Sequence, residues 1–257
     1  MTLTFKNLIE PLTLEEFHEK YHRRKFCIIK GNPFRKRFFE NIITWKELSD
    51  YLNNDRAVAG LQAILPGPAI AARGHKTVVP KNYVIPPTKK LCMEKYNLHK
   101  KKRPSWSKEH YYEKDYLFEI WKNNGSIILT KASLLTPNIS AIAGAIETYF
   151  GGAADAHFYC SRAKDGLSFP FHRDTDDNFL IHAQGTVRWI VNNSLENVEG
   201  DTTEFDLTVG DLLYIPSKLE HRAIAQSRRI SISVPLIERG MTKPLDREYY
   251  DFSNPFS

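Results

Sequence analysis

Cysteine is scarce in this sequence. The 257 residues include three cysteines, at 27, 92 and 160, which lie far apart and form no C-x-x-C motif. An odd number of scattered thiols offers neither a disulfide framework nor the ligand spacing of a zinc knuckle. We therefore expect a protein without structural disulfides, from a reducing environment.

Long apolar runs are also missing. No stretch of about 18 consecutive apolar residues occurs, so the sequence offers no candidate membrane-spanning helix. The first residues, MTLTFKNLIEPLTLEEF, lack the apolar segment behind basic residues that marks a secretory signal peptide. Together with the scarcity of cysteine, these absences predict a soluble, cytoplasmic protein that does not bind a membrane.

Positive charge is in modest excess and is concentrated in one segment. The formal net charge is +6, yet a predicted loop at about 86–112 contains, between positions 89 and 108, eight basic residues against one acid. The basic residues are Lys89, Lys90, Lys95, Lys100, Lys101, Lys102, Arg103 and Lys108. Such a run usually forms a solvated loop, but it also suits contact with RNA or a ribosome-like assembly. The nearby Trp106 would serve base stacking or would fix the loop to the core.

The first 152 residues predict a mixed region of helices and strands that supports the β-rich region after it. Helices are predicted at 13–22, 44–54 and 137–150, the first with Thr13 as its N-cap. Strands are predicted at 25–31 and 126–132, and residues 55–115 are predicted to form loops with short strands.

After Gly151 and Gly152 the pattern changes to short segments rich in β-branched and aromatic residues, separated by turn sequences such as KDG and VGD. These segments are HFYCSR, NFLIHA, VRWIVNN, TEFDLTV, DLLYIP and RRISISVPLI. Short strands at this spacing, without helices between them, predict an antiparallel sandwich or barrel. We place the barrel at 153–237, followed by a C-terminal tail at 238–257. The expected fold class is mainly β (α+β).

Within this region a histidine and an aspartate stand one residue apart, in FPFHRDTDDNF. Because side chains alternate along a strand, His172 and Asp174 point to the same side. A later histidine, His221 in GDLLYIPSKLEH, could reach them in a closed barrel. Two imidazoles and one carboxylate leave three octahedral positions open, an arrangement that suits Fe(II). The alternative is a chance charge pair, with His221 capping a turn.

The combination of H-x-D, the strand GTVRW and GDLLYIPSKLEH at these separations resembles the cupin-type JmjC oxygenases, in particular their ribosomal oxygenase (cupin 4) branch. The similarity also covers PLTLEEFHEKYHRRKFCIIKGNPF and LFEIWKNNGSIILTKASLLTPNISAIAGAIETYFGG. It implies a double-stranded β-helix, that is, a jelly-roll or cupin barrel. It further implies that His172, Asp174 and His221 hold Fe(II), with 2-oxoglutarate (2OG) as co-substrate and O₂ as oxidant. Asn178 matches an asparagine that a related asparaginyl hydroxylase places beside 2OG.

The sequence departs from this family at the residue that grips the distal carboxylate of 2OG. The family usually has Lys or Arg at the position of Val187, and Arg188 should face the opposite side of the strand. Arg229 with Ser231 resembles the 2OG-binding pair of another branch, the small-molecule oxygenases, and a guanidinium suits a carboxylate. The alternative is that Arg229 pairs with a structural acid such as Asp206.

Three further side chains complete the expectations for the site. Tyr159, on the strand before H-x-D, would add a phenol contact to 2OG or would be core. His157 and His182 have no matched partner and are expected to be ordinary packed or surface histidines. Arg173 should point away from the metal and line the substrate mouth.

The resemblance implies a 2OG- and Fe(II)-dependent hydroxylase acting on a protein side chain, such as that of a ribosomal protein. Alternatives are hydroxylation of an RNA base or a small molecule, or a cupin that binds a ligand without turnover. Ribosomal oxygenases usually continue past the barrel into a dimerising helical segment and a winged-helix-like domain, for which residues 238–257 leave little room. The oligomeric state therefore stays open.

Overall fold

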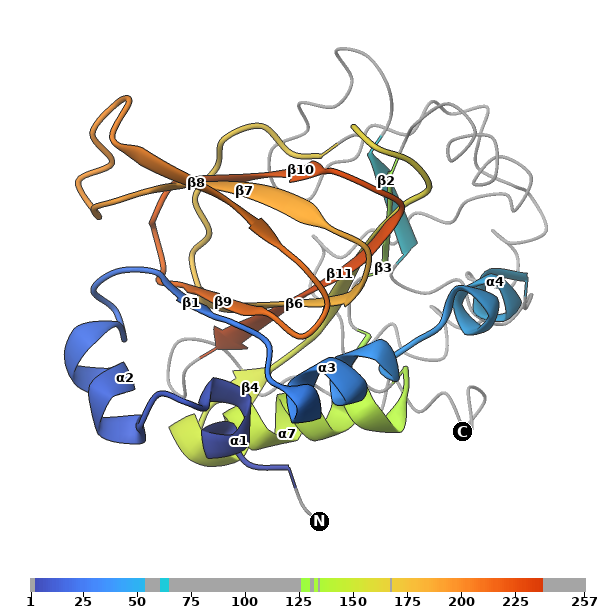
Figure 1. Cartoon of the computed structure of the whole chain (residues 1–257), viewed down its shortest axis with the longest axis horizontal. Helices are drawn as coiled ribbons and strands as arrows, with labels where there is room; N and C mark the ends of the chain where they lie inside the picture. The colour runs from blue at the N-terminus through green and yellow to red at the C-terminus, as the bar shows by residue number, and fades with distance from the viewer. Residues whose placement is uncertain are drawn as a thin grey trace, which may run out of the picture.

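A computed structural model describes residues 3–53, 61–64, 126–129, 132–133, 135–166 and 168–237 (Figure 1). The basic segment 89–108 and the tail 238–257 lie outside these residues, as does most of the predicted loop region 55–115. In the part of the chain that the structure describes, no helix has the length and hydropathy needed to cross a membrane.

The helices begin where the sequence supplies capping side chains. The helix expected at 13–22 is α2 (Leu14–Lys20), where Thr13 and Glu16 form a capping box. The helix α4 (Trp45–Asn53) follows Thr44, and α7 (Pro137–Phe150) ends at Gly151, whose φ of 69° is left-handed. Two further helices, α1 (Phe5–Ile9) and α3 (Pro33–Glu40), were not expected from the sequence.

Two antiparallel sheets form the body of the molecule. The larger sheet has the order β1-β9-β6-β11-β5-β3-β2, with β4 paired to β11, and the smaller has the order β10-β7-β8. The strands of the larger sheet are β1 (Cys27–Ile29), β2 (Leu61–Ile64), β3 (Ser126–Leu129), β4 (Ala153–Ala154), β5 (His157–Ser161), β6 (Asp177–Gln184), β9 (Leu212–Ile215) and β11 (Arg229–Ile237). Those of the smaller sheet are β7 (Val187–Asn192), β8 (Thr202–Leu207) and β10 (His221–Ala225).

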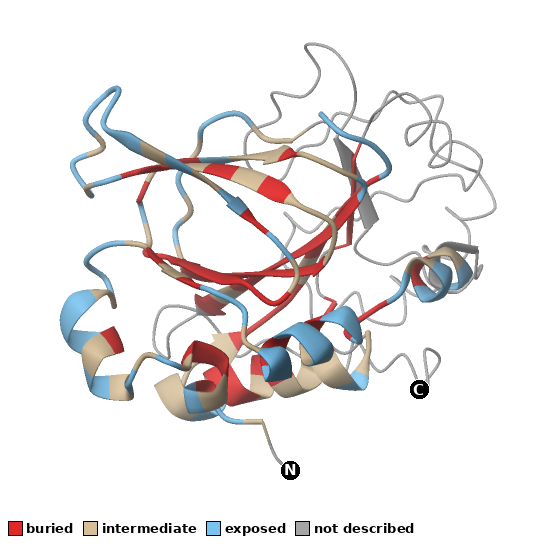
Figure 2. Ribbon diagram, in the orientation of Figure 1, coloured by how far each residue is buried: buried red, intermediate tan, exposed pale blue. Residues whose placement is uncertain are grey.

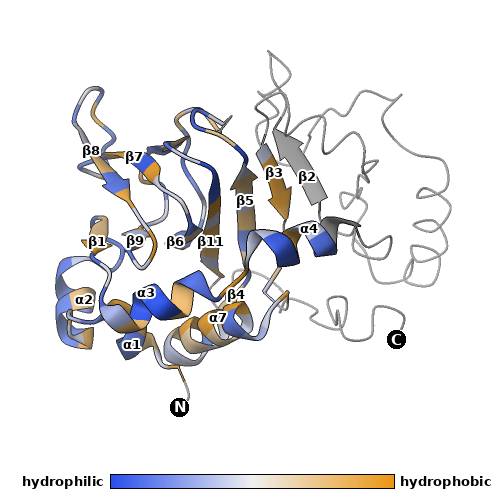
Figure 3. Ribbon diagram, turned by 45° about the vertical axis from the view of Figure 1, so that its right-hand side comes forward, coloured by the Kyte–Doolittle hydropathy of each residue, from blue (hydrophilic) through white to orange (hydrophobic). Residues whose placement is uncertain are grey.

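The larger sheet is buried on both faces, because the smaller sheet covers one and helices α1, α3 and α7 cover the other (Figures 1 and 2). Successive side chains of β6 point alternately to these two faces. Phe179 and Ile181 join the helix-side core, whereas Leu180 joins the core between the sheets. Figure 3 shows the orange of hydrophobic residues on β3 in the larger sheet and along parts of the helix α7. This two-sheet arrangement is the expected jelly-roll barrel.

The barrel draws strands from both halves of the sequence. Strand β1 pairs with β9, and β3 pairs with β5, so the segments expected as strands at 25–31 and 126–132 both belong to the larger sheet. Residue 153, where the barrel was expected to begin, is thus preceded in the sequence by strands of the same sheet.

A buried arginine fastens the N-terminal helices to the barrel. Arg35, on α3, is fully buried, and its guanidinium donates to the carbonyl oxygens of Leu8 and Gly210 at 3.2 Å each. It also donates to the carbonyls of Glu10 and Lys30. Gly210 allows this approach because its φ is 95° and a Cβ there would lie 2.9 Å from the Cα of Lys36.

Candidate metal centre

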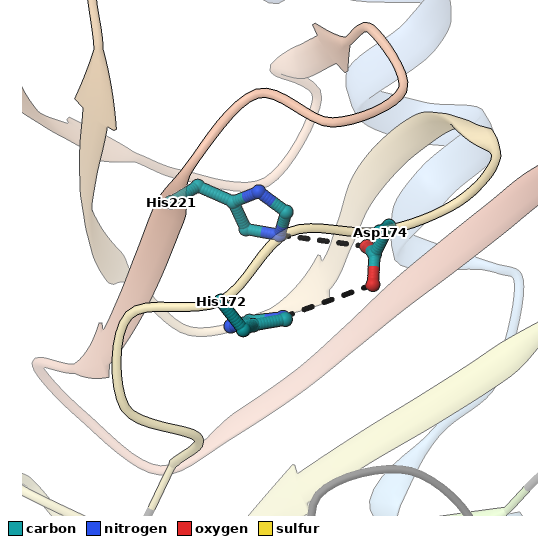
Figure 4. A group of neighbouring side chains, drawn as sticks. All are labelled: His172, Asp174 and His221. Atoms are coloured by element: carbon teal, nitrogen blue, oxygen red, sulfur yellow. Dashed lines mark ion pairs between the residues drawn. The ribbon is translucent and has the colours of Figure 1, made fainter. Parts of the chain in front are cut away.

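The two histidines and the aspartate expected at the metal site converge in the structure (Figure 4). His172 and Asp174 lie in the connection before β6, and His221 is the first residue of β10. The backbone N–H of His172 donates to the carbonyl of His221 at 3.1 Å, and the N–H of His221 donates to the carbonyl of His172 at 2.9 Å. The connection is therefore held against β10 at the point where the side chains meet.

The three side chains could enclose one cation. Their ligand atoms all lie within 4.8 Å of one another, and the two imidazole ring centroids are 4.4 Å apart. The Nε2 atom of His221 is 3.5 Å from Oδ2 of Asp174, and Nε2 of His172 is 4.0 Å from Oδ1. His221 is buried, whereas His172 and Asp174 are partly exposed, so the site opens toward solvent on one side.

Hydrogen bonds prepare both imidazoles as ligands. Nδ1 of His172 donates to the carbonyl of Pro170, and Nδ1 of His221 donates to the carbonyl of Leu219, each at 2.9 Å. A carbonyl only accepts, so each neutral ring carries its proton on Nδ1 and leaves a lone pair on Nε2. Both Nε2 atoms face Asp174 (Figure 4). Burial, and then the charge that His221 would carry if it were protonated, lower the pKa of His172, which favours this neutral form.

Asn178 orients the carboxylate of the cluster. Its Nδ2 donates to Oδ2 of Asp174 at 2.6 Å, while its own Oδ1 accepts from the hydroxyl of Ser233 at 2.8 Å. Burial raises the pKa of Asp174, but the hydrogen bond and the positive charge that His221 supplies when it is protonated, and then the charge of protonated His172, lower it below its ordinary value. In this structure Asn178 therefore acts on the metal-ligand set through Asp174.

Arg229 is the buried cation of the same pocket. It is 2% exposed, and its Nε and Nη2 donate to the hydroxyls of Ser161 at 3.2 Å and Ser168 at 2.8 Å. Among the described residues no carboxylate forms an ion pair with it. Burial lowers its pKa to about 10, which still leaves it charged at neutral pH. A buried positive charge with two neutral hydroxyl partners suits an anionic ligand.

The alternative partner, Asp206, is engaged elsewhere. Arg188 donates to both of its carboxylate oxygens, at 2.8 and 3.1 Å, on the outer face of the smaller sheet. Val187, the neighbour of Arg188, is fully buried in the core between the sheets. The alternation expected along this strand is therefore present. The position that usually carries the basic residue faces the interior with an apolar side chain.

Polar side chains from three adjacent strands form the floor of the pocket. Ser231 on β11 lies directly opposite Tyr159 on β5 and His182 on β6. These side chains line one pocket that opens to solvent. It is lined by Tyr159, Ser168, Phe169, His172, Asp174, Leu180, Ile181, His182, Trp189, His221, Ala223, Arg229, Ser231, Ile232 and Ser233. The candidate metal ligands and the candidate 2OG-binding residues Arg229, Ser231 and Tyr159 thus share one cavity, while Asn178 lies behind Asp174.

The remaining expectations had mixed outcomes. His157 is partly exposed and lies 3.7 Å from Asp155, as an ordinary histidine would. His182 is packed, as expected, but it lies on the pocket floor rather than in general core. Arg173 is exposed and pairs with Glu220 at 3.5 Å. Ser168 was missed, because no feature of its sequence marks a loop serine that folds over an arginine 61 residues later.

Comparisons with known proteins agree with this arrangement. Residues 135–243 match the family model of the JmjC domain. The fold is similar to that of YcfD, a ribosomal oxygenase from Escherichia coli, with a TM-score of 0.54 at 15% identity. The complex of YcfD with cobalt and 2-oxoglutarate gives a TM-score of 0.55 at 16% identity. No curated protein sequence matches this chain.

These matches differ in how much of each protein they cover. The two YcfD structures match 93% of this chain but 53% and 54% of their own, so the chain spans about half the length of the structures it resembles. At these identities the similarity establishes the fold alone, which this chain shares with YcfD. Residues 135–243, which include His172, Asp174 and His221, are thus similar to a JmjC domain, in agreement with the resemblance in the sequence.

Proposed function

We propose that this protein is a 2OG- and Fe(II)-dependent oxygenase that hydroxylates a protein side chain. The observation that carries the proposal is the presence, in one pocket, of the cluster His172, Asp174 and His221 and of the buried cation Arg229. A three-residue ligand set leaves coordination positions open for a co-substrate and for O₂. The buried arginine supplies the charge that the far end of a dicarboxylate requires.

The donor set fits Fe(II). His172 and His221 would each contribute a neutral Nε2, and Asp174 would contribute a carboxylate oxygen oriented by Asn178. When bound, the metal would supply the activation of O₂ that couples oxidation of 2OG to succinate and CO₂ with hydroxylation of a C–H bond. The protein's own part is to fix these ligands in place and to keep the remaining coordination positions accessible.

The pocket floor would bind the distal carboxylate of 2OG. Arg229 would donate to it from the guanidinium, and the hydroxyls of Ser231 and Tyr159 lie on the same floor. Burial raises the pKa of Tyr159, so its phenol stays protonated and able to donate. Apolar side chains, including Leu180 and Trp189, line the cavity beside these donors and exclude water from the charged contact.

For the substrate we propose a side chain of a ribosomal protein. The support is the similarity to YcfD, which is described as a ribosomal oxygenase, together with the basic segment 89–108, which would favour a site near RNA. The proposal includes a cytoplasmic location, where ribosomes are found. An RNA base is the competing substrate, and mass spectrometry of both classes of molecule separates the two.

Turnover without substrate tests the enzymatic part of the proposal. Purified protein with Fe(II), ascorbate and 2OG should form succinate slowly, and His172→Ala should abolish this activity. Arg222→Ala, which alters an exposed residue of the same strand as His221, is the matched control and should keep it. If neither succinate formation nor 2OG binding is detected for the unmodified protein, the chain is instead a cupin that binds a ligand without turnover.

Mass spectrometry tests the substrate. Ribosomal proteins and transfer RNA from cells with the active protein are compared with those from cells carrying His172→Ala. We expect the mass of one added oxygen atom on a ribosomal protein, present only with the active protein. The same mass increase on RNA, with unmodified ribosomal proteins, would replace the protein substrate by an RNA base.

A further inference from the structure

His182 is a histidine on the pocket floor with two hydrogen-bonding neighbours. It lies on β6, is completely buried, and lines the same cavity as Arg229. Its Nε2 is 3.2 Å from the indole Nε1 of Trp189 on β7, and its Nδ1 is 3.2 Å from the hydroxyl oxygen of Ser231 on β11. The ring therefore connects the smaller sheet to the strand that carries the proposed 2OG-binding pair.

The indole fixes the protonation of this ring. Trp189 Nε1–H can only donate, so Nε2 of His182 must accept and carries no proton. The proton of the neutral ring must therefore be on Nδ1. An imidazolium would place a second N–H against the indole N–H, and both burial and the charge of Arg229 lower the pKa of His182, to about 3.

The tautomer of His182 fixes the role of Ser231 in turn. Since Nδ1 carries the proton, it donates to the oxygen of Ser231, which accepts. In the part of the chain that the structure describes, this hydroxyl makes no other hydrogen bond, and Ser231 lines the cavity. Its own proton is thus available to a ligand in the pocket, beside the guanidinium of Arg229.

We propose that His182 is a positioning residue that commits the hydroxyl of Ser231 to donate, so that the pocket floor offers only donors to the distal carboxylate of 2OG. Two hydrogen bonds in series, here called the relay, connect Trp189 to His182 and His182 to Ser231. No proton is transferred along them. This inference rests on the proposed function, because it assigns the relay to the 2OG-binding end of the same pocket.

Two substitutions separate this role from simple packing. In His182→Gln the amide oxygen can accept from Trp189 while the amide nitrogen donates to Ser231, so the relay is preserved. In His182→Leu both contacts are lost and the Ser231 hydroxyl is free to rotate. Calorimetry on the Mn(II)-loaded protein should show 2OG binding about tenfold weaker in the leucine variant and near the unmodified value in the glutamine variant.

A double-mutant cycle and a second ligand test the path of the effect. Ser231→Ala should weaken 2OG binding in the unmodified protein but have little further effect in the leucine background. The analogue 2-oxopentanoate lacks the distal carboxylate, so the leucine substitution should leave its affinity unchanged. Equal weakening of both ligands, or independent effects of the two substitutions, would overturn the assignment.

Nitrogen NMR of the unmodified protein gives a readout that does not depend on 2OG. We expect His182 to be neutral with the proton on Nδ1, and a proton on Nε2 would refute the relay even if the leucine variant does not fold. If 2OG does not bind the unmodified protein at all, the proposed function fails together with the ligand assignment. The NMR result would then still report whether the relay exists.

Discussion

His172 and His221 are joined through their main chains, each backbone N–H donating to the other's carbonyl, at 3.1 and 2.9 Å. They belong to segments far apart in the sequence, and this reciprocal pair of backbone hydrogen bonds holds the two segments together where their side chains meet. The candidate metal centre is thus largely organised by the fold, since each ring is also oriented by a hydrogen bond from its Nδ1.

A metal ion should stabilise the fold. A cation that binds only the folded state at 100 times its Kd adds about 2.7 kcal/mol to the free energy of unfolding. We therefore expect Mn(II) or Co(II) to raise the Tm of the unmodified protein, measured by thermal unfolding, and to have almost no effect on His221→Ala. An equal rise in both would show that the cation binds elsewhere.

Asn178→Ala should weaken metal binding without removing a ligand. The amide of Asn178 orients Asp174 at 2.6 Å, and loss of such a supporting hydrogen bond typically costs tenfold to a hundredfold in metal affinity. Calorimetric titration with Co(II) measures the change. Asn193→Ala, which removes an exposed amide bonded to Asp201, is the control and should bind Co(II) like the unmodified protein. Identical affinities for the two variants would remove Asn178 from the site.

Arg229→Ala should raise the 2OG requirement strongly. Hydrogen bonds to a charged group contribute about 1.5–3 kcal/mol, so we expect the Kd of 2OG to rise by about tenfold to a hundredfold. Arg188→Ala, on the outer face of the smaller sheet, should leave it unchanged, because Arg188 pairs with Asp206 and Glu204 there. Similar effects of both substitutions would contradict the placement of the co-substrate beside β11.

Local patterns were sufficient to predict most strands of the barrel, whereas the family resemblance supplied the candidate site residues. Alternation along β7 predicts that Val187 faces inward and Arg188 outward, and an arginine on a later strand is the available substitute. These inferences succeed because strand periodicity is a property of neighbouring residues.

The parts that could not be predicted depend on distant pairing. In the sequence, His182 is one more residue of a buried strand. Its contact with Trp189 exists only because the turn after β6 brings the two residues together in the folded chain. Ser168 lies in a loop, whose course no periodicity specifies. The helix α3 was missed although Asn32 and Pro33 form an N-terminal signal, because it has only eight residues and three of them are basic.

Arg35→Met should destabilise the fold without touching the pocket. The guanidinium serves four backbone carbonyls from three parts of the chain, and the substitution would leave buried acceptors without partners. At about 1–3 kcal/mol for a single unsatisfied group, we expect a loss of at least about 3 kcal/mol in the free energy of unfolding. Urea denaturation measures it, with the exposed Arg37→Met on the same helix as the control. Equal stabilities would mean that the carbonyls find other donors.

Acid should destabilise the protein through His182. Its pKa is about 3 in the folded state against an ordinary value of 6.5, so only the unfolded chain binds this proton between those pH values. Stability therefore falls as pH decreases through that window, by up to about 1.4 kcal/mol per pH unit. Between about pH 7 and pH 5 the unmodified protein should lose about 2 kcal/mol more than His182→Gln, measured by urea denaturation. Equal losses would show that the ring is protonated in the folded protein.

Val187 stands where the family usually has a basic residue, and the proposed replacement by Arg229 has a structural consequence. His221 belongs to the smaller sheet, whereas Arg229 belongs to the larger one. A dicarboxylate bound at one end beside His221 and at the other end by Arg229 would therefore contact both sheets. We therefore expect bound 2OG to connect the two sheets through its two ends and so to limit their movement relative to each other.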